Sequence, residues 1–587
     1  MQLMPSATLQ SRRPGRDLGG WLRTSDGGLL TLALLVGAGA GLFAVVFRWL
    51  IGFFTTVFSG HEDYAATPGA DNPHVPWLGP FFVLLAPMLA GLLYGPLVRY
   101  FAPEARGHGV PEVMYAVAQN GGRIRPQVAI VKALASALCI GGGGSVGREG
   151  PIVQIGSAIG STLGVRTKLD EARLQVLVAC GAAGGIAATF NAPLAGVFFA
   201  MELILASWAA QSFGMVVISA VTASVIGRTL LGDEPFLALP QFHLVHHWEY
   251  LLFALLGVLG GLAGVLFTRV LYAIEDACDA VWRGPEWLRP VVGGLLLGVV
   301  LLVLPQMYGV GYPVLGNAVD GRYAIWFLLV LIVGKMVATS LTIGIGGSGG
   351  VFAPSLFIGA ALGAAFGETA GLIAGSSVAG AGAYAVIGMG AVFAGSARAP
   401  ITAVLILFEL TGEYSVILPL MVAIVIAAGI SHRISKETIY TLKLVRRGVD
   451  LGRGPETIAT RRRVRDVMQA VPAPVEQGMS LRDAAALLAT SASGVLPVVD
   501  EDGLFVGTVT ARVVAEALAT GRDADPVELV REYPTRLLAG DSLRRALDVL
   551  SSAGAAAVPV HGADDDLDSD RVVGWITYQD ALVGVRT

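Results

Sequence analysis

Apolar segments fill most of this chain, and glycine or proline interrupts many of them. They recur between residues 29 and 431, and several are shorter than the ~20 residues that one helix needs to cross a bilayer. Irregular backbone is tolerated at membrane depth only where it is buried in protein or lines a cavity. Interrupted segments in both halves of a chain indicate discontinuous helices around a binding site near the membrane midplane. The pattern therefore predicts a mostly α-helical membrane protein of many tilted and broken helices.

Composition supports the membrane assignment and argues against other classes of protein. Of the 587 residues, 14% are charged and 54% are hydrophobic, whereas soluble domains average ~25% charged residues. The net charge of −4 says nothing about nucleic acid, and no concentrated basic domain supports a nucleic-acid partner. The cysteines Cys139, Cys180 and Cys278 lie far apart. We interpret them as small core side chains and predict no disulfide and no metal site.

Three glycine-rich loops each lead through a proline into an apolar helix. They are Gly-His-Gly-Val-Pro at 107–111, Gly-Arg-Glu-Gly-Pro at 147–151, and a loop at 346–354 that ends in Gly-Gly-Val-Phe-Ala-Pro. Proline suits the first turn of a helix, and glycine lets other groups approach the backbone closely. Each loop predicts a helix N-terminus whose free N–H groups and positive dipole end attract an anion. Three such sites predict a protein that moves anions across a membrane.

The second loop places a carboxylate, that of Glu149, at the helix end where an anion would bind. Two explanations stay open from the residues alone. In the first, Glu149 blocks an anion path when it is ionised and clears that path when it is protonated. In the second, Glu149 caps its helix or pairs with Arg148, because buried charges are usually paired.

The three loops, in this order, resemble the anion-binding motifs of the CLC family of chloride channels and proton-coupled anion exchangers. Tyr440, in a Thr-Ile-Tyr sequence, resembles a fourth motif, and Phe-Asn-Ala-Pro-Leu-Ala-Gly at 190–196, followed by Glu202, resembles a fifth. The resemblance spans roughly residues 25–445, and several ordered motifs make it specific. It implies a CLC fold of inverted repeats and a homodimer with one pore per subunit. It also implies chloride as the substrate, no enzymatic activity and no required cofactor.

The resemblance further implies a set of site residues. It makes Glu149 the gating glutamate, and it leaves Arg148 a mainly structural role beside the anion. Val351 and Phe352 would supply backbone N–H groups to the central anion, and Tyr440 its hydroxyl. The alternatives are core packing for the first two and an interfacial aromatic belt for Tyr440. The complete set of implied anion-binding residues is His108, Gly109, Arg148, Gly150, Val351, Phe352 and Tyr440.

Two positions depart from the usual CLC pattern. His108 stands where most members have serine, and its imidazole either donates to the anion or turns away and caps the loop. Leu203 stands where proton-coupled exchangers often carry a second glutamate that takes protons from the cytoplasm. Leucine cannot carry a proton, so this position favours the channel branch. The proton-path candidates are Glu149, Glu202 and His108, although we expect a structural role for Glu202 near the dimer interface.

The leading functional prediction is therefore a chloride channel that is gated by Glu149 and sensitive to pH. The alternative is a proton-coupled chloride/H+ antiporter. A third hypothesis, a nucleotide-sensing membrane regulator, is disfavoured by the intact anion motifs. Fluoride export is not expected, because fluoride-specific relatives depart from the Gly-Arg-Glu-Gly-Pro sequence that is intact here.

The distribution of positive charge predicts how the chain is oriented. Arginines precede the apolar run at 29–58, which is too long for the ~7–15-residue core of a signal peptide. The loop at 60–77 contains acidic residues without Lys or Arg, and a basic cluster follows Tyr440. Because basic residues favour the cytoplasmic side, we expect a multi-pass protein of the plasma membrane with both termini in the cytoplasm.

The sequence changes to ordinary soluble α/β character after residue 445. We expect a cytoplasmic segment at 1–28, a CLC transmembrane domain at 29–445, a basic linker at 446–463 and an α/β region at 464–587. This last region contains a repeat, because Ser-Leu-Arg at 480–482 recurs at 542–544 and a Pro-Val sequence follows each copy. It resembles a tandem pair of CBS modules, at 464–523 and 524–587.

The second CBS-like module carries a candidate nucleotide site. Nucleotide-binding CBS modules often use a Thr, and an Asp three residues later, to bind ribose and phosphate. Thr577 and Asp580 fit this pattern, whereas in the first module Thr510 is followed by Val513. The resemblance thus implies at most one adenine-nucleotide site, and a purely structural dimerisation module is the alternative. We interpret the acidic run at 564–570 as a solvated loop, because it lacks the glycine and terminal glutamate of an EF-hand.

Four charged residues lie in or beside apolar runs, namely Lys132, Lys335, Arg398 and Glu409. Charges at membrane depth are costly, so such side chains either pair inside the protein or extend toward the membrane surface. We expect internal pairing or extension of this kind, in preference to a role in lining the pore.

Overall fold

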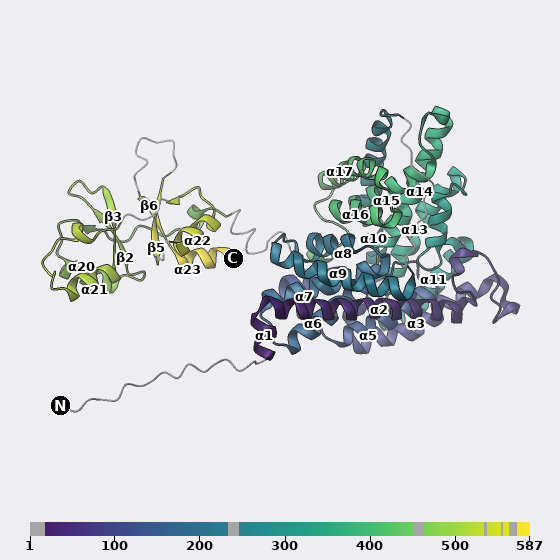
Figure 1. Ribbon diagram of the computed structural model, residues 1–587, viewed down its shortest axis with the longest axis horizontal. Helices are drawn as coiled ribbons and strands as arrows, with labels where there is room; N and C mark the ends of the chain where they lie inside the picture. The colour runs from purple at the N-terminus through teal and green to yellow at the C-terminus, as the bar shows by residue number, and fades with distance from the viewer. Residues whose placement is uncertain are drawn as a thin grey trace, which may run out of the picture. The chain divides into compact units, whose positions relative to one another are not determined.

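The computed structural model of the protein describes residues 18–232, 246–449, 462–532, 537–552, 556–562 and 572–586. The acidic run at 564–570 lies outside the described residues, as do most of the residues of the expected 1–28 and 446–463 segments. The chain divides into two units, residues 1–449 and 450–587, and each is described by itself. The first unit is helical and the second is α/β (Figure 1).

The first unit is built from α-helices of very different lengths, the longest of which are α2 and α10. The helices are α1 (Leu18–Thr24), α2 (Asp26–Ser59), α3 (Phe82–Phe101), α4 (Val110–Gln119), α5 (Gln127–Gly141), α6 (Glu149–Arg166), α7 (Glu171–Phe190), α8 (Pro193–Phe199), α9 (Ala210–Leu231), α10 (Glu249–Val281), α11 (Arg289–Val303), α12 (Tyr312–Val319), α13 (Ile325–Gly344), α14 (Phe352–Ala374), α15 (Ala381–Ala397), α16 (Pro400–Thr411), α17 (Ile417–Ile434) and α18 (Thr441–Arg446). A π-helical turn, Ala200–Leu205, continues α8.

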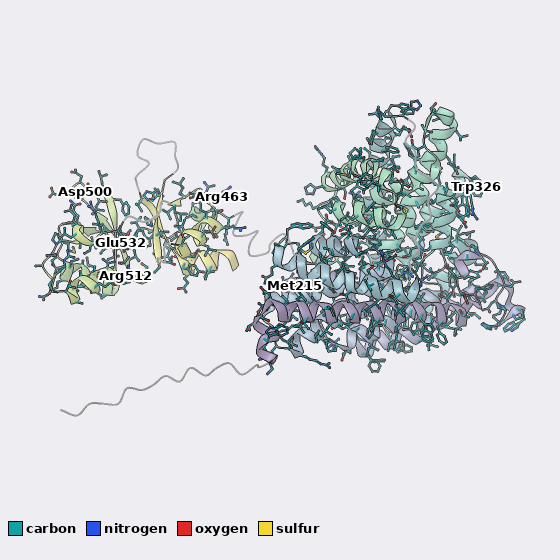
Figure 2. All side chains as sticks on the ribbon, in the orientation of Figure 1. Met215, Trp326, Arg463, Asp500, Arg512 and Glu532 are labelled. Carbon is teal, nitrogen blue, oxygen red and sulfur yellow. The ribbon has the colours of Figure 1, made fainter. Side chains whose placement is uncertain are left out.

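Eight helical segments of the described residues are long and apolar enough to cross a membrane. Five shorter apolar segments, including Gln127–Gly141 and Ala381–Ala397, fall below that length. The outer surface of this unit carries large apolar side chains such as Trp326, which is 68% exposed (Figure 2). Such a surface suits contact with lipid, since soluble proteins seldom expose wide apolar patches. The predicted mixture of spanning and broken helices is confirmed.

Small residues let the helices of this unit approach one another closely. Helices α2, α7 and α9 run side by side (Figure 1), and a Cβ added at Gly37 would lie 2.4 Å from the carbonyl oxygen of Ser219. Helices α6 and α7 meet in the same way, because a Cβ at Gly156 would lie 2.1 Å from the carbonyl oxygen of Gly181. Contacts of this kind are typical of helix packing in membranes, where van der Waals contact drives association.

Two short helices cap one another reciprocally. Glu409 accepts hydrogen bonds from the N–H groups of Leu194 and Ala195 at the start of α8, at 2.9 and 2.7 Å. Glu202 accepts from the N–H and hydroxyl groups of Thr402 at the start of α16, at 2.9 and 2.7 Å. A carboxylate at a helix N-terminus satisfies otherwise unpaired N–H groups. Such mutual capping is expected where two halves of a chain repeat the same structure. The bonds to Leu194 and Ala195 confirm that Glu409 pairs inside the protein.

The second unit contains two small sheets with the same topology. Its strands are β1 (Val475–Glu476), β2 (Val495–Val499), β3 (Phe505–Thr510), β4 (Leu537–Leu538), β5 (Ala557–His561) and β6 (Val572–Thr577). Its α-helices are α20 (Leu481–Thr490), α21 (Ala511–Ala519), α22 (Leu543–Ser552) and α23 (Tyr578–Arg586). In each sheet the first strand pairs parallel with the second, and the second pairs antiparallel with the third. The sequence repeat is therefore a structural repeat as well.

Each half of the second unit has its own apolar core. Val498 lies in the core of the first half and Val560 in that of the second. On the surface, Arg512 and Glu532 lie close together (Figure 2) and form an ion pair of 3.6 Å. Because both side chains are largely exposed, this pair adds little to stability.

Candidate functional site

Backbone pairing brings the starts of α4, α6 and α14 together in the interior of the helical unit. In the loops before α4 and α14, Gly107 donates to the carbonyl of Gly347 (3.0 Å) and accepts from the N–H of Gly349 (3.3 Å). In the loops before α6 and α14, Gly147 and Gly350 exchange two N–H···O=C bonds of 2.7 and 2.6 Å. The first N–H groups of a helix have no partner within it, so the space between these helix ends carries a positive potential.

Two glycines allow this close approach. A Cβ added at Gly150 would lie 1.9 Å from the carbonyl oxygen of His108, and one at Gly109 would lie 2.6 Å from that of Gly150. Gly109 also has a φ of 84°, in the left-handed region that favours glycine. The loop before α4 therefore rests directly on the first turn of α6.

Glu149 lies at the centre of these helix ends and is 1% exposed. One carboxylate oxygen accepts a hydrogen bond from the hydroxyl of Tyr312, the first residue of α12. The other accepts from the backbone N–H of Ala353 in the first turn of α14, at 3.3 Å. The carboxylate thus occupies the N-terminus of a second helix, which is the position that a bound anion would take.

Arg148 lies behind this arrangement, on the side of Tyr312. Its guanidinium group is 5.0 Å from the centre of the Tyr312 ring, within the range of a cation–π contact. It also donates to the carbonyl of Thr189 at 3.5 Å. These contacts position the tyrosine that holds Glu149.

Two fully buried lysines hold the loops of the site from behind. Lys132 of α5 donates to two carbonyl groups of the loop before α4, at 2.9 and 2.8 Å. Lys335 of α13 donates to two carbonyl groups of the loop before α12, at 3.2 and 3.0 Å, and to the hydroxyl of Ser145 at 3.0 Å. Internal pairing is confirmed for both lysines, which also bring positive charge to the anion site.

Tyr312 was not among the predicted site residues, although the sequence contains a signal for it. Gly-Val-Gly-Tyr-Pro at 309–313 repeats the build of Gly-His-Gly-Val-Pro at 107–111. Each of the two loops precedes a short helix and accepts hydrogen bonds from one buried lysine. A search for this internal repeat would have shown a fourth helix start, with Tyr312 at its first position.

His108 is 2% exposed, and neither ring nitrogen has a hydrogen-bond partner among the described residues. Its ring packs edge-on against that of Tyr272 of α10, with 6.1 Å between ring centres. Burying both nitrogens of an imidazole without partners is unfavourable. Such a ring is therefore suited to a ligand, or to a proton that passes through it.

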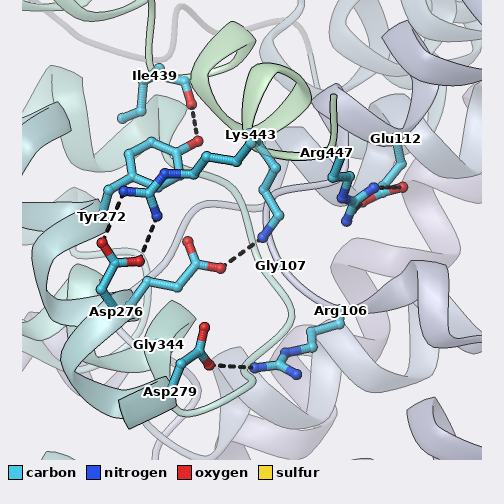
Figure 3. Close-up of polar contacts among 12 residues, drawn as sticks. Arg106, Gly107, Glu112, Tyr272, Asp276, Asp279, Gly344, Ile439, Lys443 and Arg447 are labelled. Carbon is cyan, nitrogen blue, oxygen red and sulfur yellow. Dashed lines mark hydrogen bonds and ion pairs between the residues drawn. The ribbon is translucent and has the colours of Figure 1, made fainter. Parts of the chain in front are cut away.

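Tyr440 is 1% exposed and precedes α18 directly. The backbone of this segment is fixed on both sides, because Ile439 donates to the carbonyl of Ser396 (2.9 Å) and accepts from the hydroxyl of Tyr272 (2.8 Å). Figure 3 shows the second of these bonds, between Tyr272 and Ile439. Because Tyr440 is buried inside the protein, it does not belong to an aromatic belt at the membrane surface.

A cavity of about 1100 Å³ opens beside the Glu149 cluster. Arg148 and Tyr312 form part of its wall, together with Arg48 of α2 and Asp63 in the loop after α2. Burial raises the pKa of Asp63, and the hydrogen bond from the N–H of Ala65 opposes this shift. The cavity thus gives solvent a route to the groups that hold Glu149.

In the second unit, Thr577 and Asp580 are in direct contact. The hydroxyl of Thr577 donates to the Asp580 carboxylate (2.6 Å), and the N–H of Asp580 donates back to the Thr577 hydroxyl (3.1 Å). The other carboxylate oxygen accepts from the side chain of Gln469 at 2.7 Å. These bonds form an N-terminal cap on α23.

Comparison with known proteins decides the family. The family model described as "Voltage gated chloride channel" matches residues 90–432, which is more than half of the chain. This chain belongs to the CLC family. A CBS domain model matches residues 464–520, so the membrane unit of this CLC protein is followed by a CBS region.

Curated relatives cover most of the membrane unit. The H(+)/Cl(-) exchange transporter ClcA of Vibrio parahaemolyticus is 35% identical over 71% of this chain and 89% of its own length. A Ralstonia nicotianae protein named as a ClcB-like chloride channel protein is 33% identical over 73% of this chain and 99% of its own.

Among solved structures, a slow cyanobacterial Cl-/H+ antiporter is 28% identical, with a TM-score of 0.65 over 71% of this chain and 97% of its own. A eukaryotic CLC transporter covers 96% of this chain and 98% of its own, with a TM-score of 0.60 at 21% identity, and that likeness concerns the fold alone. The protein is therefore a multi-pass membrane protein that transports chloride, and it is not an enzyme.

The CLC fold brings together most of the residues expected at the anion site. His108, Gly109 and Gly150 meet where the loops before α4 and α6 touch, and Glu149 reaches the first turn of α14, which begins at Phe352. Two sets of candidates are not part of this cluster. Glu202 is engaged in capping α16, and Thr577 and Asp580 belong to the second unit.

Proposed function

We propose that this CLC protein is a proton-coupled chloride exchanger. The identities of 35% to an H(+)/Cl(-) exchange transporter and 28% to a solved Cl-/H+ antiporter support this proposal. The observation that carries it is the position of the Glu149 carboxylate, buried against the start of α14. One titratable group placed where the anion binds couples the two ions, because the site holds either the ionised carboxylate or chloride.

The proposed cycle follows from the contacts of Glu149. When it is ionised, the carboxylate accepts from Tyr312 and Ala353 and occupies the helix end. Protonation removes its charge, which weakens its hold on the α14 N-terminus. Chloride then takes the vacated position, with backbone N–H groups of Val351 and Phe352, the Tyr440 hydroxyl and the His108 ring as its proposed ligands. Loss of the proton returns the carboxylate and displaces the anion.

A passive channel is the second candidate, and Leu203 is the observation that favours it. This residue has no titratable group, and it is 9% exposed in the π-helical turn. The ClcB-like chloride channel relative also fits this reading. We place exchange first because the exchangers include relatives of higher identity. We also infer a homodimer with both termini in the cytoplasm, from the family resemblance and the distribution of arginines.

The test of exchange is a thermodynamic one. In liposomes that contain the full-length protein, an outward chloride gradient should drive protons inward against a pH gradient. The zero-current voltage should then lie away from the chloride equilibrium potential, by an amount that the transport ratio fixes. A zero-current voltage that follows chloride alone, whatever the pH gradient, would establish the channel instead.

We also infer that an adenine nucleotide binding to this protein uses the second CBS-like module. Asp580 supplies a carboxylate beside the Thr577 hydroxyl, whereas in the first module Thr510 caps only the N–H of Val513. The bonds of Asp580 to Thr577 and Gln469 also serve the structural alternative, in which the pair only caps α23.

Calorimetry on the full-length protein with ATP, ADP and AMP distinguishes the two alternatives. We expect a heat of binding with one of these nucleotides, and we expect Asp580→Ala to abolish it. Thr510→Ala is the matched control in the first module and should leave the heat as it is in the wild type. No heat with any nucleotide would mean that the module is purely structural.

A further inference from the structure

Proton-coupled exchange requires a proton donor on the side of the site opposite the cavity. Leu203 cannot fill this role, and the Glu202 carboxylate is held by the N-terminus of α16. Another titratable group must therefore lie between that side and the anion site. The segment that follows Tyr440 supplies the candidates.

Three basic residues follow Tyr440 within the first unit, Lys443, Arg446 and Arg447, and each pairs with an acid of another helix. Lys443 contacts Glu275 of α10 at 2.8 Å, and Arg446 contacts the next residue, Asp276, at 2.6 Å. Figure 3 shows Lys443 and Asp276, one residue of each pair, close to Gly107 and Tyr272. This cluster of ion pairs thus adjoins the loop of the anion site. We call Glu275, Lys443 and His108 the inner triad.

Glu275 differs from the other acids of this cluster. Its side chain is 13% exposed, and its Oε2 atom is buried without a hydrogen-bond partner among the described residues. The Asp276 side chain is 58% exposed, and both of its carboxylate oxygens are bound by Arg446. A buried carboxylate oxygen without a donor is costly. Among the described residues, Glu275 is therefore the acid of this cluster that has a buried oxygen open to a further hydrogen-bond donor.

The triad leads to the anion site through Lys443 and Tyr272. The Lys443 ammonium lies 3.5 Å from the position that a Cβ at Gly107 would take, next to His108. Tyr272 lies three residues before Glu275 on α10, so both side chains share one face of the helix, and its ring contacts that of His108. The backbone carbonyl of His108 lies against Gly150, the residue after Glu149. Glu275, His108 and Glu149 thus follow one another through packed groups.

We propose that Glu275 and His108 form the inner proton path of this exchanger and replace the acid that is missing at position 203. A proton from the solvent binds Glu275 Oε2. That O–H bond then breaks as one nitrogen of the neutral His108 ring gains the proton. The other ring nitrogen releases its own proton toward Glu149, which restores a neutral imidazole. Lys443 keeps its positive charge throughout and holds the second oxygen of Glu275.

The charges around the inner triad favour passing a proton on from His108 over keeping it there. The ionisable groups that interact with His108 are Lys132, Lys443 and Arg447. Those that interact with Glu275 are Tyr272, Cys278, Lys443, Arg446 and Arg447. Because the charged groups that interact with His108 are all cationic, they disfavour an imidazolium ion there, and its proton moves on. This inference rests on the proposed exchange function.

The test compares proton and chloride fluxes of the full-length protein in liposomes. In Glu275→Gln, the number of protons moved per chloride should fall at least about ten-fold, as removal of a positioned proton donor predicts. The matched control is Asp276→Asn, which neutralises the neighbouring acid and breaks an ion pair of the same kind. It should keep the wild-type ratio.

Two further variants distinguish the loss of a proton path from a folding defect. His108→Ser should lower the same ratio, and combining it with Glu275→Gln should lower it no further, because the two residues act in one path. Leu203→Glu in the Glu275→Gln background should restore coupling by supplying an acid at the usual position. If Glu275→Gln does not fold, His108→Ser decides the question.

The possible failures are distinguishable. A wild-type protein without coupled proton movement would overturn exchange itself, and the inner path with it. A coupled wild type whose ratio is unchanged in Glu275→Gln or in His108→Ser would overturn the inner path alone. Equal losses in Asp276→Asn and Glu275→Gln would also overturn it, because the effect would then come from the ion-pair cluster as a whole.

Discussion

Glu149→Gln should abolish chloride-driven proton movement while chloride still crosses the membrane. Glutamine has nearly the shape of the protonated acid but cannot bind and release a proton. It also cannot hold the α14 N-terminus as an anion does. The zero-current voltage should then move to the chloride equilibrium potential and stop responding to the pH gradient. Proton flux should fall by at least about 10²-fold, the range for a lost proton-transfer group.

The control for this result is Glu368→Gln, the same change on α14, in a half-buried acid outside the Glu149 cluster. It should retain wild-type coupling. If Glu149→Gln still moves protons against their gradient at the wild-type ratio, then the coupling group lies elsewhere. The position of Glu149 at the helix ends would then reflect capping alone.

Gly150→Ala should reduce chloride flux by at least about ten-fold, because its added methyl group collides with a backbone carbonyl that has little room to move. The Cβ would lie 1.9 Å from the carbonyl oxygen of His108. Neither partner can rotate away, since His108 belongs to a loop that Lys132 fixes through its carbonyl groups. The starts of α4 and α6 must separate, which displaces the N–H groups around the anion. Chloride efflux from liposomes measures the effect.

Gly214→Ala is the matched control for that substitution. It changes a glycine of α9 whose added Cβ would meet nothing within 4 Å. Alanine is also the better helix former, so stability should be equal or slightly higher. Chloride flux that is normal in both variants would mean that the loops at Gly107 and Gly147 can move apart without cost.

The sequence was sufficient to predict the membrane unit and the helix starts at its three glycine-rich loops. Glycine, proline and apolar residues in a fixed order determine where helices start, and a helix start has the same N–H groups in any context. The site at Glu149 could be proposed on that basis. The lysines at 132 and 335 were also correctly expected to pair internally, because a buried charge needs partners.

The channel hypothesis shows where such local reasoning ends. It rested on one position, Leu203, where proton-coupled exchangers often carry the acid that takes protons from the cytoplasm. A water chain or another acid could replace that route. The fold offers a different acid in Glu275, which pairs with Lys443 across 168 residues of chain. No spacing in the sequence connects these two residues.

What the sequence determined by itself was the local chemistry of this protein, namely three glycine-rich helix starts of the kind that suits an anion, a carboxylate at one of them and a repeated α/β region. What only the tertiary structure decided was which distant groups meet that chemistry. Tyr312 binds Glu149 although 163 residues separate them in the chain. Glu409 of α16 caps the start of α8, and Glu202, in the turn that continues α8, caps the start of α16. The physical reason is that a helix end depends on a few neighbouring residues, whereas a buried polar contact depends on how whole helices pack.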